Sequence, residues 1–352
     1  MAQVAVLPAF KNSKQSKLVA LVSGDKTKLK ELGKRYGVTQ LYSYDDYDRC
    51  LRSGEIDAVY IALPNTMHES YAVRAAEAGI HVLCEKPLSV VPAESERMIR
   101  AAKLAEIRFM AAYRLHFDPA NLKAIEMIHS GKIGEPHYFT SEFSYVLKSD
   151  NIRARGDEGG SPLHDIGIYC INAARYLFKS EPTEVFAMAV NTDPRLKDID
   201  QTVSATLKFP QNRIAQFTCS FASAPRSSYR VVCAKGDVHL ENAYEYVGEV
   251  TTTITRNEKK QVIKSKPGDQ FAAELEYFSQ CVKSGRDPEP SGEHGLVDVQ
   301  IIEALHRSID SGKTVSLKNN LPKIKSRPTL RMKIKRPSHR EPKLIGVEAA
   351  SK

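Results

Sequence analysis

The sequence lacks the patterns that several classes of protein need. Its six cysteines include no CxxC pair, and scattered thiols in a chain of this length indicate reduced core residues rather than disulfides or a zinc site. HExxH and GxSxG motifs are absent, which argues against a zinc peptidase and a serine hydrolase. No apolar run approaches the roughly 18 residues of a membrane span. We therefore expect no metal and no membrane partner.

The composition that remains is ordinary for a folded protein. Hydrophobic residues make up 42% and charged residues 26% of the 352 residues, so the chain can bury a sizeable core. A chain of this length suggests about two domains. We place the first domain at residues 1–117 and the second at residues 118–317, with a tail at residues 318–352.

The net charge of +9 belongs to that tail. Ten Lys or Arg residues and one acid lie between Lys318 and Lys343, whereas the charges of residues 1–317 balance. Four prolines and little apolar periodicity predict an extended, largely unpacked segment. We favour a solvated arm over a polyanion-binding arm. Because aromatic and basic residues do not interleave in the body, we expect no nucleic-acid partner.

Short apolar strands alternate with helices in the first domain. This alternation is typical of βαβ units and predicts a doubly wound, Rossmann-like parallel sheet. The expected strands are at residues 18–23, 57–62, 81–84 and 108–112, and the expected helices are at residues 26–36, 45–53, 67–78 and 94–105.

The usual opening of a dinucleotide-binding domain is not found in this sequence. Such a domain begins with a strand, a GxGxxG turn and a helix, but no glycine precedes Gly24, and Ala2 already reads as part of that helix. Either another phosphate cradle exists or the sequence begins about 30 residues late, which we favour because the rest of the domain fits. The strands at residues 18–22 and 57–62 then either pair directly or stay apart. We expect a loosened first domain that binds dinucleotide poorly.

The pattern of expected helices and strands changes at about Pro136, within the second domain. Successive strands without helices between them predict an α+β domain with a large, mainly antiparallel open sheet. The expected strands are at residues 183–191, 202–208, 214–220, 229–233 and 238–241, followed by helices at residues 271–284 and 296–311.

Two short motifs contain candidate catalytic residues. Glu85 and Lys86 directly follow a strand, at the edge of an open α/β sheet where ligands bind; alone, they could also form a surface ion pair. In the segment GGSPLHDIGIY, Asp165 and Tyr169 have the i, i+4 spacing that places both on one helix face. Taken alone, Asp165 could instead be a helix cap and Tyr169 a core aromatic.

These segments together resemble the Gfo/Idh/MocA family of NAD(P)-dependent sugar oxidoreductases. The resemblance runs in order from Ala2 to about Leu317 through LVALVSGDKTKLKELGKRYGV, DAVYIALPNTMH, HVLCEKP, AAYRLHFDPAN and GGSPLHDIGIYCINAARYLF. The branch with the greatest similarity contains glucose–fructose oxidoreductase and NADP-linked aldose and dihydrodiol dehydrogenases. Two features point there: Tyr169 replaces the family's usual histidine, and Ser23-Gly24 with Lys28 follows the expected second strand.

The resemblance implies which residues bind the cofactor. Ser23, Gly24 and Lys28 suit the 2′-phosphate of NADP, although Asp25 could accept from the 2′-hydroxyl of NAD. We therefore favour NADP, with NAD as the alternative. The ribose and nicotinamide are expected to contact residues that follow later strands, where Lys86–Pro87 is a candidate cis peptide; these residues are Leu63, Pro64, Asn65, His68, Glu85, Lys86 and Arg114.

The implied reaction transfers a hydride between nicotinamide and a sugar or related polyol. Tyr169 is the expected acid/base, the Lys86 ammonium favours its phenolate, Glu85 positions Lys86, and Asp165 holds the substrate hydroxyl or orients the pair. Because residues 2–10 lack the basic region and cleavage site of a secretory signal, we expect a cytoplasmic protein. Family resemblance also implies a homodimer or homotetramer joined through the open sheet. The alternative is a catalytically silent sugar-binding or assembly protein, which the missing glycine loop and the tyrosine-for-histidine change favour.

Overall fold

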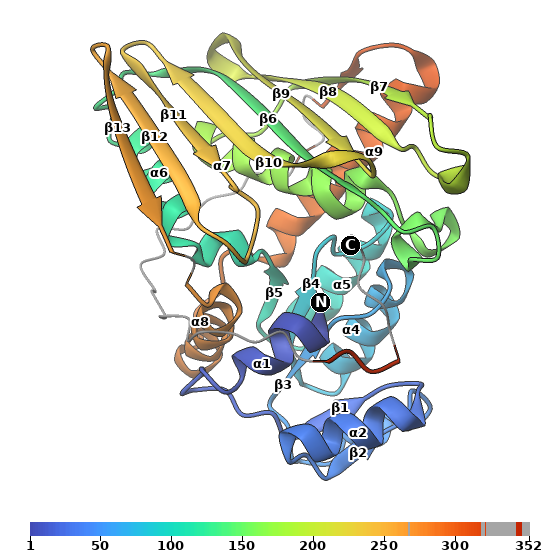
Figure 1. Cartoon of the computed structure of the whole chain (residues 1–352). Coiled ribbons are helices and arrows are strands. Elements are labelled where there is room, and N and C mark those ends of the chain that lie inside the picture. Colours follow the sequence, from blue (N-terminus) through green and yellow to red (C-terminus); the bar gives the residue numbers. More distant parts are fainter. Residues whose placement is uncertain (267, 318–320, 322–342, 347–352) are drawn as a thin grey trace.

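The strands form a region of short parallel sheets and a region with one large sheet (Figure 1). The structure is a computed structural model that describes residues 1–266, 268–317, 321 and 343–346. The first region lies at the N-terminal end of the sequence and the second follows it, as the sequence predicts.

Each sheet of the first region is parallel, and helices lie between successive strands. Helix α2 begins after Asp25, whose carboxylate accepts from the Lys28 backbone N–H, and it ends at Gly37 with φ 69°. A left-handed C-cap of this kind favours glycine. Except for β2, which was not expected, the elements match the predicted ones to within a few residues; they are β1 (Ala20–Val22), α2 (Lys26–Tyr36), β2 (Gln40–Tyr42), α3 (Tyr47–Leu51), β3 (Ala58–Ile61), α4 (His68–Glu77), β4 (His81–Glu85), α5 (Pro92–Leu104) and β5 (Phe109–Ala112).

The parallel strands are divided between two sheets. β1 pairs with β2, and the order of the other sheet is β3-β4-β5. Among the described strands none lies between β1 and β3, and these two strands do not pair with each other. The sequence left open whether they pair directly or stay apart, and in the structure they stay apart. The π-helix η1 (Ala2–Val6) and α1 (Leu7–Ala9) pack with Leu83 and Met110 of the second sheet and with α8 (Gln270–Ser284).

The second region is built on a nine-stranded sheet of order β13-β12-β11-β10-β6-β9-β8-β7-β14. It is antiparallel except for the parallel pair β6–β9. The predicted strands are confirmed, whereas β6, β12, β13 and β14 were not expected. The strands are β6 (Pro136–Val146), β7 (Glu184–Val190), β8 (Thr202–Phe209), β9 (Arg213–Ser220), β10 (Ala222–Cys233), β11 (Gly236–Glu241), β12 (Val250–Arg256), β13 (Lys259–Ser265) and β14 (Val315–Ser316).

Helices α6 (Pro119–His129), α7 (Ile168–Phe178) and α9 (Gly292–Ser311) lie on one side of the large sheet (Figure 1). A buried ion pair fixes α7 to α9: Arg175 Nη1 lies 2.6 Å from Asp298 Oδ1, and neither side chain is exposed to solvent. Asn172 and Tyr113 donate to the other oxygen of Asp298. Removing one partner of such a pair leaves an uncompensated buried charge, so the position of α7 is strongly specified.

The end of the chain packs in part on the first region. Within the predicted tail, residues 318–320, 322–342 and 347–352 lie outside the described residues. At Ile345 the backbone N–H donates to the side chain of Gln3 at 2.9 Å, and the Gln3 amide donates back to the carbonyl at 2.7 Å. The Ile345 side chain is buried with Leu7 and Leu32. For Lys343–Gly346 the prediction of an unpacked tail is therefore wrong, because this apolar segment finds an apolar partner.

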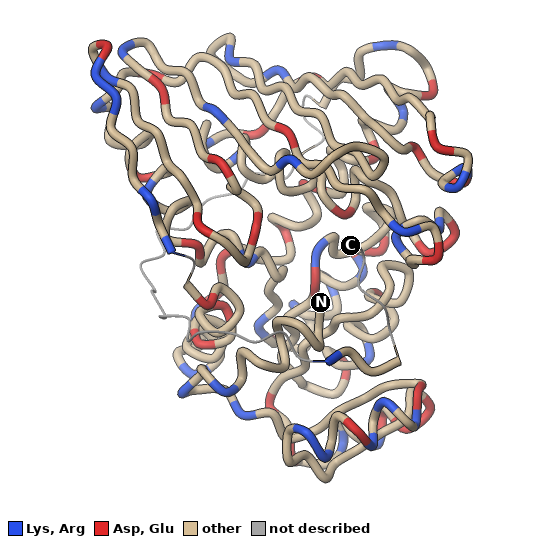
Figure 2. Tube along the Cα trace, in the orientation of Figure 1, with Lys and Arg blue, Asp and Glu red and all other residues tan. Residues whose placement is uncertain are grey.

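Acidic and basic residues are interspersed over both regions (Figure 2), in agreement with a body whose charges balance. No helix in the described part of the chain is both long and apolar enough to cross a membrane.

Candidate active site

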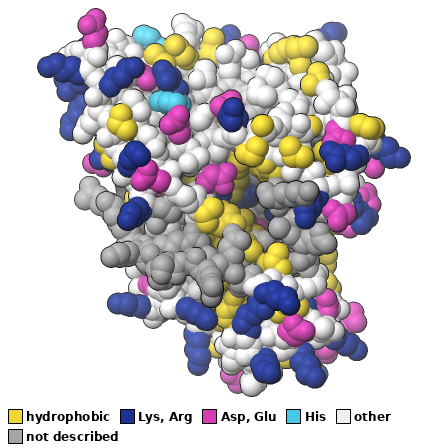
Figure 3. Space-filling model, viewed as in Figure 1, with side chains coloured by type: hydrophobic (Ala, Val, Ile, Leu, Met, Phe, Trp, Pro, Cys, Tyr) yellow, Lys and Arg dark blue, Asp and Glu magenta, His cyan; other side chains and the backbone are white. Residues whose placement is uncertain are grey.

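A cleft of about 1900 Å³ joins the two regions. Residues of β1 and β3 line it on either side of the separation between the two parallel sheets. Its other walls include η1, part of α8, the ends of β4 and β5 and several residues between 143 and 169. In Figure 3, hydrophobic side chains are visible between the part that carries the large sheet and the part that carries α2. Every predicted site residue except Gly24 lines this cleft.

The predicted catalytic residues meet in the cleft. The Lys86 ammonium donates to the backbone carbonyl of Asp165 at 2.7 Å and lies 3.3 Å from Asp165 Oδ1. Its Nζ lies 4.7 Å from the centroid of the Tyr169 ring, and the Arg114 guanidinium carbon lies 4.9 Å from the same centroid. Two cations therefore lie beside one phenol ring, an arrangement that stabilises each cation over the π-system.

Local folding explains why these side chains converge. β4 ends at Glu85, and the Lys86–Pro87 peptide is cis, as predicted. The π-helical turn η6 (Leu163–Gly167) contains Asp165 and continues directly into α7, whose first turn carries Tyr169. Asp165 is thus inside a helical turn rather than at its cap. Tyr169 is buried, with 5% of its surface exposed, and it lines the cleft.

Two further side chains surround the Asp165 carboxylate. Arg153 Nε lies 3.0 Å from Oδ2, and the Tyr145 hydroxyl donates to the same oxygen at 2.8 Å. Burial opposes ionisation of Asp165, but the charges of Arg153 and Lys86 outweigh it and lower its pKa. Burial likewise opposes the charge on Lys86, and its neighbours, chiefly Tyr169 and Asp165, raise the pKa of the ammonium. We infer that the pair is ionised at neutral pH.

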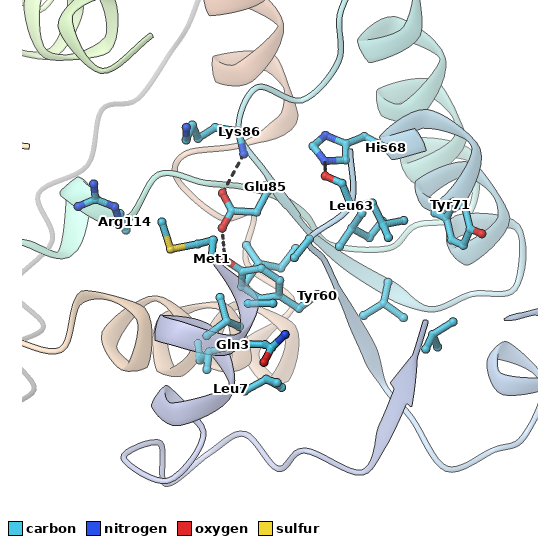
Figure 4. A pocket seen from close by; sticks show the side chains of 18 of the residues that line it. Met1, Gln3, Leu7, Tyr60, Leu63, His68, Tyr71, Glu85, Lys86 and Arg114 are labelled. Atoms are coloured by element: carbon cyan, nitrogen blue, oxygen red, sulfur yellow. Dashed lines mark hydrogen bonds between the residues drawn. The ribbon is translucent and has the colours of Figure 1, made fainter. Parts of the chain in front are cut away.

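Glu85 has a different partner from the expected one. Its carboxylate accepts from the Tyr60 hydroxyl at 2.8 Å and from the Lys86 backbone N–H at 3.3 Å (Figure 4). Tyr60 of β3 is paired with Leu83 of β4, and residues two apart on a strand share a face, so Glu85 lies on the same face of the sheet as Tyr60. The Lys86 side chain, which follows the strand, reaches Asp165 instead. The prediction that Glu85 positions the ammonium is therefore wrong; Asp165 holds it. Beside Tyr60, burial raises the pKa of the fully buried Glu274 well above its ordinary range.

Two residues expected at the cofactor use their polar atoms within the protein. His68 is fully buried, and its ring nitrogens lie 2.9 Å from the Pro87 carbonyl oxygen and 3.0 Å from that of Leu63. Asn65 donates to the Gly159 carbonyl at 2.9 Å. His68 thus ties the Leu63–Pro64 segment to the Lys86–Pro87 turn instead of offering a hydrogen bond to a ligand.

The opposite end of the cleft is formed by Ser23 and Lys28. Because the Asp25 carboxylate caps α2, it is already engaged by a backbone donor, which weakens the case for its binding a ribose hydroxyl. Gly24 packs against the Tyr44 ring instead of lining the cleft. Gly346 lies next to Asp25 and Lys28, since a Cβ on it would lie 2.8 Å from Asp25 Oδ2.

The residues present suit the two ends of a nicotinamide dinucleotide. Near the reactive centre, the buried Arg114 Nε has no hydrogen-bond partner among the described residues, and such a donor is costly to leave unpaired. At the far end, Lys28 offers a cation for a phosphate. Within the described residues no group of three or more His, Cys, Asp or Glu side chains could hold a metal ion.

The sequence matches known families in both regions. Residues 1–113 match the oxidoreductase family with an NAD-binding Rossmann fold, and residues 121–239 match the GFO/IDH/MocA C-terminal domain. The chain belongs to the Gfo/Idh/MocA family. An uncharacterized oxidoreductase from Rhizobium meliloti is 32% identical over 315 residues, covering 87% of this chain and 93% of that protein.

Relatives whose activity is named are similar to this chain over most of its length. The NADP-linked D-xylose 1-dehydrogenase of Haloarcula marismortui is 30% identical over 88% of this chain and 89% of its own. The crystal structure of an aldose–aldose oxidoreductase from Caulobacter crescentus complexed with glycerol has a TM-score of 0.85 and 35% identity, covering 89% of this chain and 95% of that one. A 3-ketoreductase from Actinomadura kijaniata with NADP and TDP-benzene has a TM-score of 0.80 and 27% identity, covering 88% and 94%. The family and fold predictions are confirmed.

Sequence reasoning missed Arg153, Tyr145 and Glu274. Arg153 stands only a few residues before the glycine pair of the Gfo/Idh/MocA motif, and that nearness was the available signal. Tyr145 and Glu274 belong to elements whose neighbours in space are distant in sequence.

Proposed function

We propose that this member of the Gfo/Idh/MocA family is an NADP-linked oxidoreductase that interconverts a CH–OH group of a sugar or related polyol with the carbonyl. The observation that carries the proposal is the placement of the Lys86 and Arg114 cations beside the Tyr169 ring, with Asp165 holding Lys86. The NADP-linked sugar dehydrogenase among the relatives supports both the cofactor and the substrate class.

Proton transfer falls to the chain's own residues. When bound, the nicotinamide cofactor supplies the hydride donor or acceptor. In the oxidation direction the Tyr169 phenolate oxygen removes the proton from the substrate hydroxyl, and in reduction it returns the proton. Lys86 and Arg114 stabilise the negative charge on that oxygen, since unit charges a few ångströms apart in a partly buried site interact by several kcal/mol.

Asp165 acts here as an anchor and not as the base. One of its carboxylate oxygens faces Lys86, and the other faces Arg153 and Tyr145. Leu63 and Pro64 line the cleft with apolar surface on the way to the far end, where Ser23 and Lys28 would hold the 2′-phosphate. A charged contact of this type favours NADP over NAD.

The outer face of the large sheet supports a proposal of homodimers or homotetramers. Tyr138 and Ile214 are neighbouring partners on β6 and β9, and both are exposed. Met188 and Val190 of β7 are also exposed. Apolar patches of this kind on an open sheet are typical of subunit contacts. Light scattering with size-exclusion chromatography tests the assembly.

Turnover with a panel of aldoses and polyols tests the function. We expect reduced cofactor to form with NADP⁺ at a higher kcat/KM than with NAD⁺, and the carbonyl product to appear in equal amount. Because the sequence contains no GxGxxG turn to hold the pyrophosphate, we expect the KM for either cofactor to be high. Sugar binding without turnover, measured by calorimetry in the presence of NADP⁺, would instead establish the catalytically silent binding protein.

A further inference from the structure

Arg153 lies outside both motifs yet reaches the centre of the cleft. It belongs to the short 3₁₀ helix η4 (Ile152–Ala154), in the connection between β6 and α7. Its Nε lies 3.0 Å from Asp165 Oδ2, and 29% of its side chain is exposed. Arg153 also lines the cleft that contains Lys86 and Tyr169.

The surrounding loop holds Arg153 in this position. The Asn151 side chain accepts a hydrogen bond from the Arg153 backbone N–H. Gly160 passes so close that a Cβ on it would lie 2.4 Å from the Arg153 carbonyl oxygen. Its neighbour Gly159 has φ 74°, and a Cβ there would lie 2.5 Å from Val90. The glycine pair of the motif is therefore required for the packing of the loop that carries Arg153.

Charge balance distinguishes Arg153 from a simple surface partner. Without it, the Lys86 ammonium and the Asp165 carboxylate would neutralise each other. With it, Asp165 is shared between two cations on its two oxygens. The three groups together then carry one net positive charge beside Tyr169.

Arg155, two residues further along, provides the contrast. The ion pairs that the described residues form with it come from Asp157 and Glu158 in its own loop, and 57% of its side chain is exposed. A surface pair of this kind contributes little. The same short loop thus carries one arginine directed at the reacting groups and one directed at solvent.

We propose that Arg153 is a positioning residue of the reaction. It neutralises the Asp165 carboxylate from the Oδ2 side, so that this carboxylate does not cancel the positive charge of Lys86, which stays available to Tyr169 and the substrate oxygen. This inference rests on the proposed function and assigns Arg153 a part in proton transfer. The groups that interact electrostatically with Asp165, Lys86 or Tyr169 come from every element around them; they are Met1 (amino group), Tyr60, Glu85, Arg114, Tyr145 and Arg153.

Arg153→Ala, Arg153→Lys and the matched control Arg155→Ala test the proposal. In Arg153→Ala we expect kcat for sugar oxidation to fall about tenfold, because the net charge of the Lys86, Asp165 and position-153 side chains falls from +1 to zero, and a factor of ten corresponds to about 1.4 kcal/mol. The pH of half-maximal oxidation rate should move upward, while the Kd for NADPH stays within a factor of about two. Arg153→Lys should recover part of kcat, because it restores the charge without the fork geometry. Added guanidinium ion should partly rescue Arg153→Ala but not Gly160→Ala, which displaces the loop and leaves the side chain present.

A second measurement keeps the inference separate from the proposed function. Selective ¹⁵N-labelling of lysine makes the Lys86 ammonium nitrogen observable without altering it, and NMR then follows its titration, with Lys86→Arg assigning the resonance. Since Arg153 lowers the pKa of Lys86 by charge repulsion, the label should titrate at higher pH in Arg153→Ala than in the parent protein and in Arg155→Ala. An inactive parent protein would refute the proposed function while this titration still decides the role of Arg153. Unchanged titration of Lys86, or an unchanged pH profile in an active Arg153→Ala protein, would overturn the inference.

Discussion

The two ends of the cleft are constructed in opposite ways. At the reactive end, Lys86, Asp165 and Arg153 come from three separate segments and are joined by ion pairs of 3.3 and 3.0 Å. At the other end, Ser23 and Lys28 belong to one continuous strand–helix unit, and the neighbouring sheet containing β3 is not paired with β1. One end is therefore fixed by tertiary contacts and the other by local structure.

This difference predicts how each end responds to substitution. Removal of one member of a buried charge cluster leaves its partner uncompensated, which costs several kcal/mol or changes its ionisation. Removal of one partly exposed lysine loses a single contact. Substitutions at the reactive end should therefore change turnover by orders of magnitude, and substitutions at the far end should change cofactor preference by much less.

Lys86→Ala is expected to have the largest effect. Loss of the ammonium removes both the cation beside Tyr169 and the donor to the Asp165 carbonyl, so kcat should fall by about 10²–10⁴, the scale of acid–base catalysis. NADPH affinity, measured by fluorescence, should change far less. Lys103→Ala, at an exposed lysine paired with Glu293, is the control. Normal turnover together with lost cofactor binding would contradict the assignment.

Tyr169→Phe should lower kcat by about 10²-fold or more, because it deletes the proposed proton-transfer oxygen. The ring remains in place beside Lys86 and Arg114, so thermal unfolding should change little. Single-turnover kinetics distinguishes loss of the chemical step from slow release of product. If Tyr169 is merely a core aromatic, the variant will retain its activity.

The fold was largely predictable from periodicity, and the exceptions have physical reasons. Most of the doubly wound strands are short apolar runs that were placed within a few residues, but β2 (Gln40–Tyr42) was not predicted. β6 was missed because PHYFTSEFSYV mixes polar and aromatic residues on both faces; Tyr138 is exposed outside while Phe139 is buried inside. β12 was missed although VTTTITR is rich in β-branched residues, which is the usual signal for a strand.

Only those residues of the candidate site that belong to short sequence motifs were predictable. Lys86, Asp165 and Tyr169 were found because each stands in a short recognisable pattern. Sequence reasoning assigned the wrong partner to Glu85 and missed Arg153 for the same reason. Tertiary packing determines which side chains come within hydrogen-bonding distance. Tyr60 and Glu85 are 25 residues apart in sequence, and Arg153 and Asp165 are connected by a loop.

Lys28→Ala tests the far end, with a smaller expected effect. The preference for NADP over NAD, expressed as the ratio of kcat/KM values, should fall about tenfold because one charge-assisted contact to the 2′-phosphate is lost. The value of kcat at saturating NADP⁺ should remain close to that of the parent protein. Lys26→Ala, an exposed lysine on the same helix, should leave the ratio unchanged. An equal loss in both variants would mean that general charge, and not Lys28, sets the preference.

The smallest effect is expected at Ile345, whose packing joins the end of the chain to the first region. Ile345→Ala removes a side chain that is 9% exposed and contacts Leu7 and Leu32. We expect the free energy of unfolding to decrease by about 1 kcal/mol, less than the 2–5 kcal/mol of an enclosed core site, because this cluster is small and peripheral. Lys343 has an exposed side chain, and its backbone carbonyl accepts a hydrogen bond from Arg35. Lys343→Ala should leave the free energy of unfolding unchanged because that carbonyl is retained. Denaturant unfolding of both variants makes the comparison. Equal stability of Ile345→Ala and the parent protein would mean that the segment does not stabilise the first region, and the originally expected unpacked tail would then describe residues 343–346 as well.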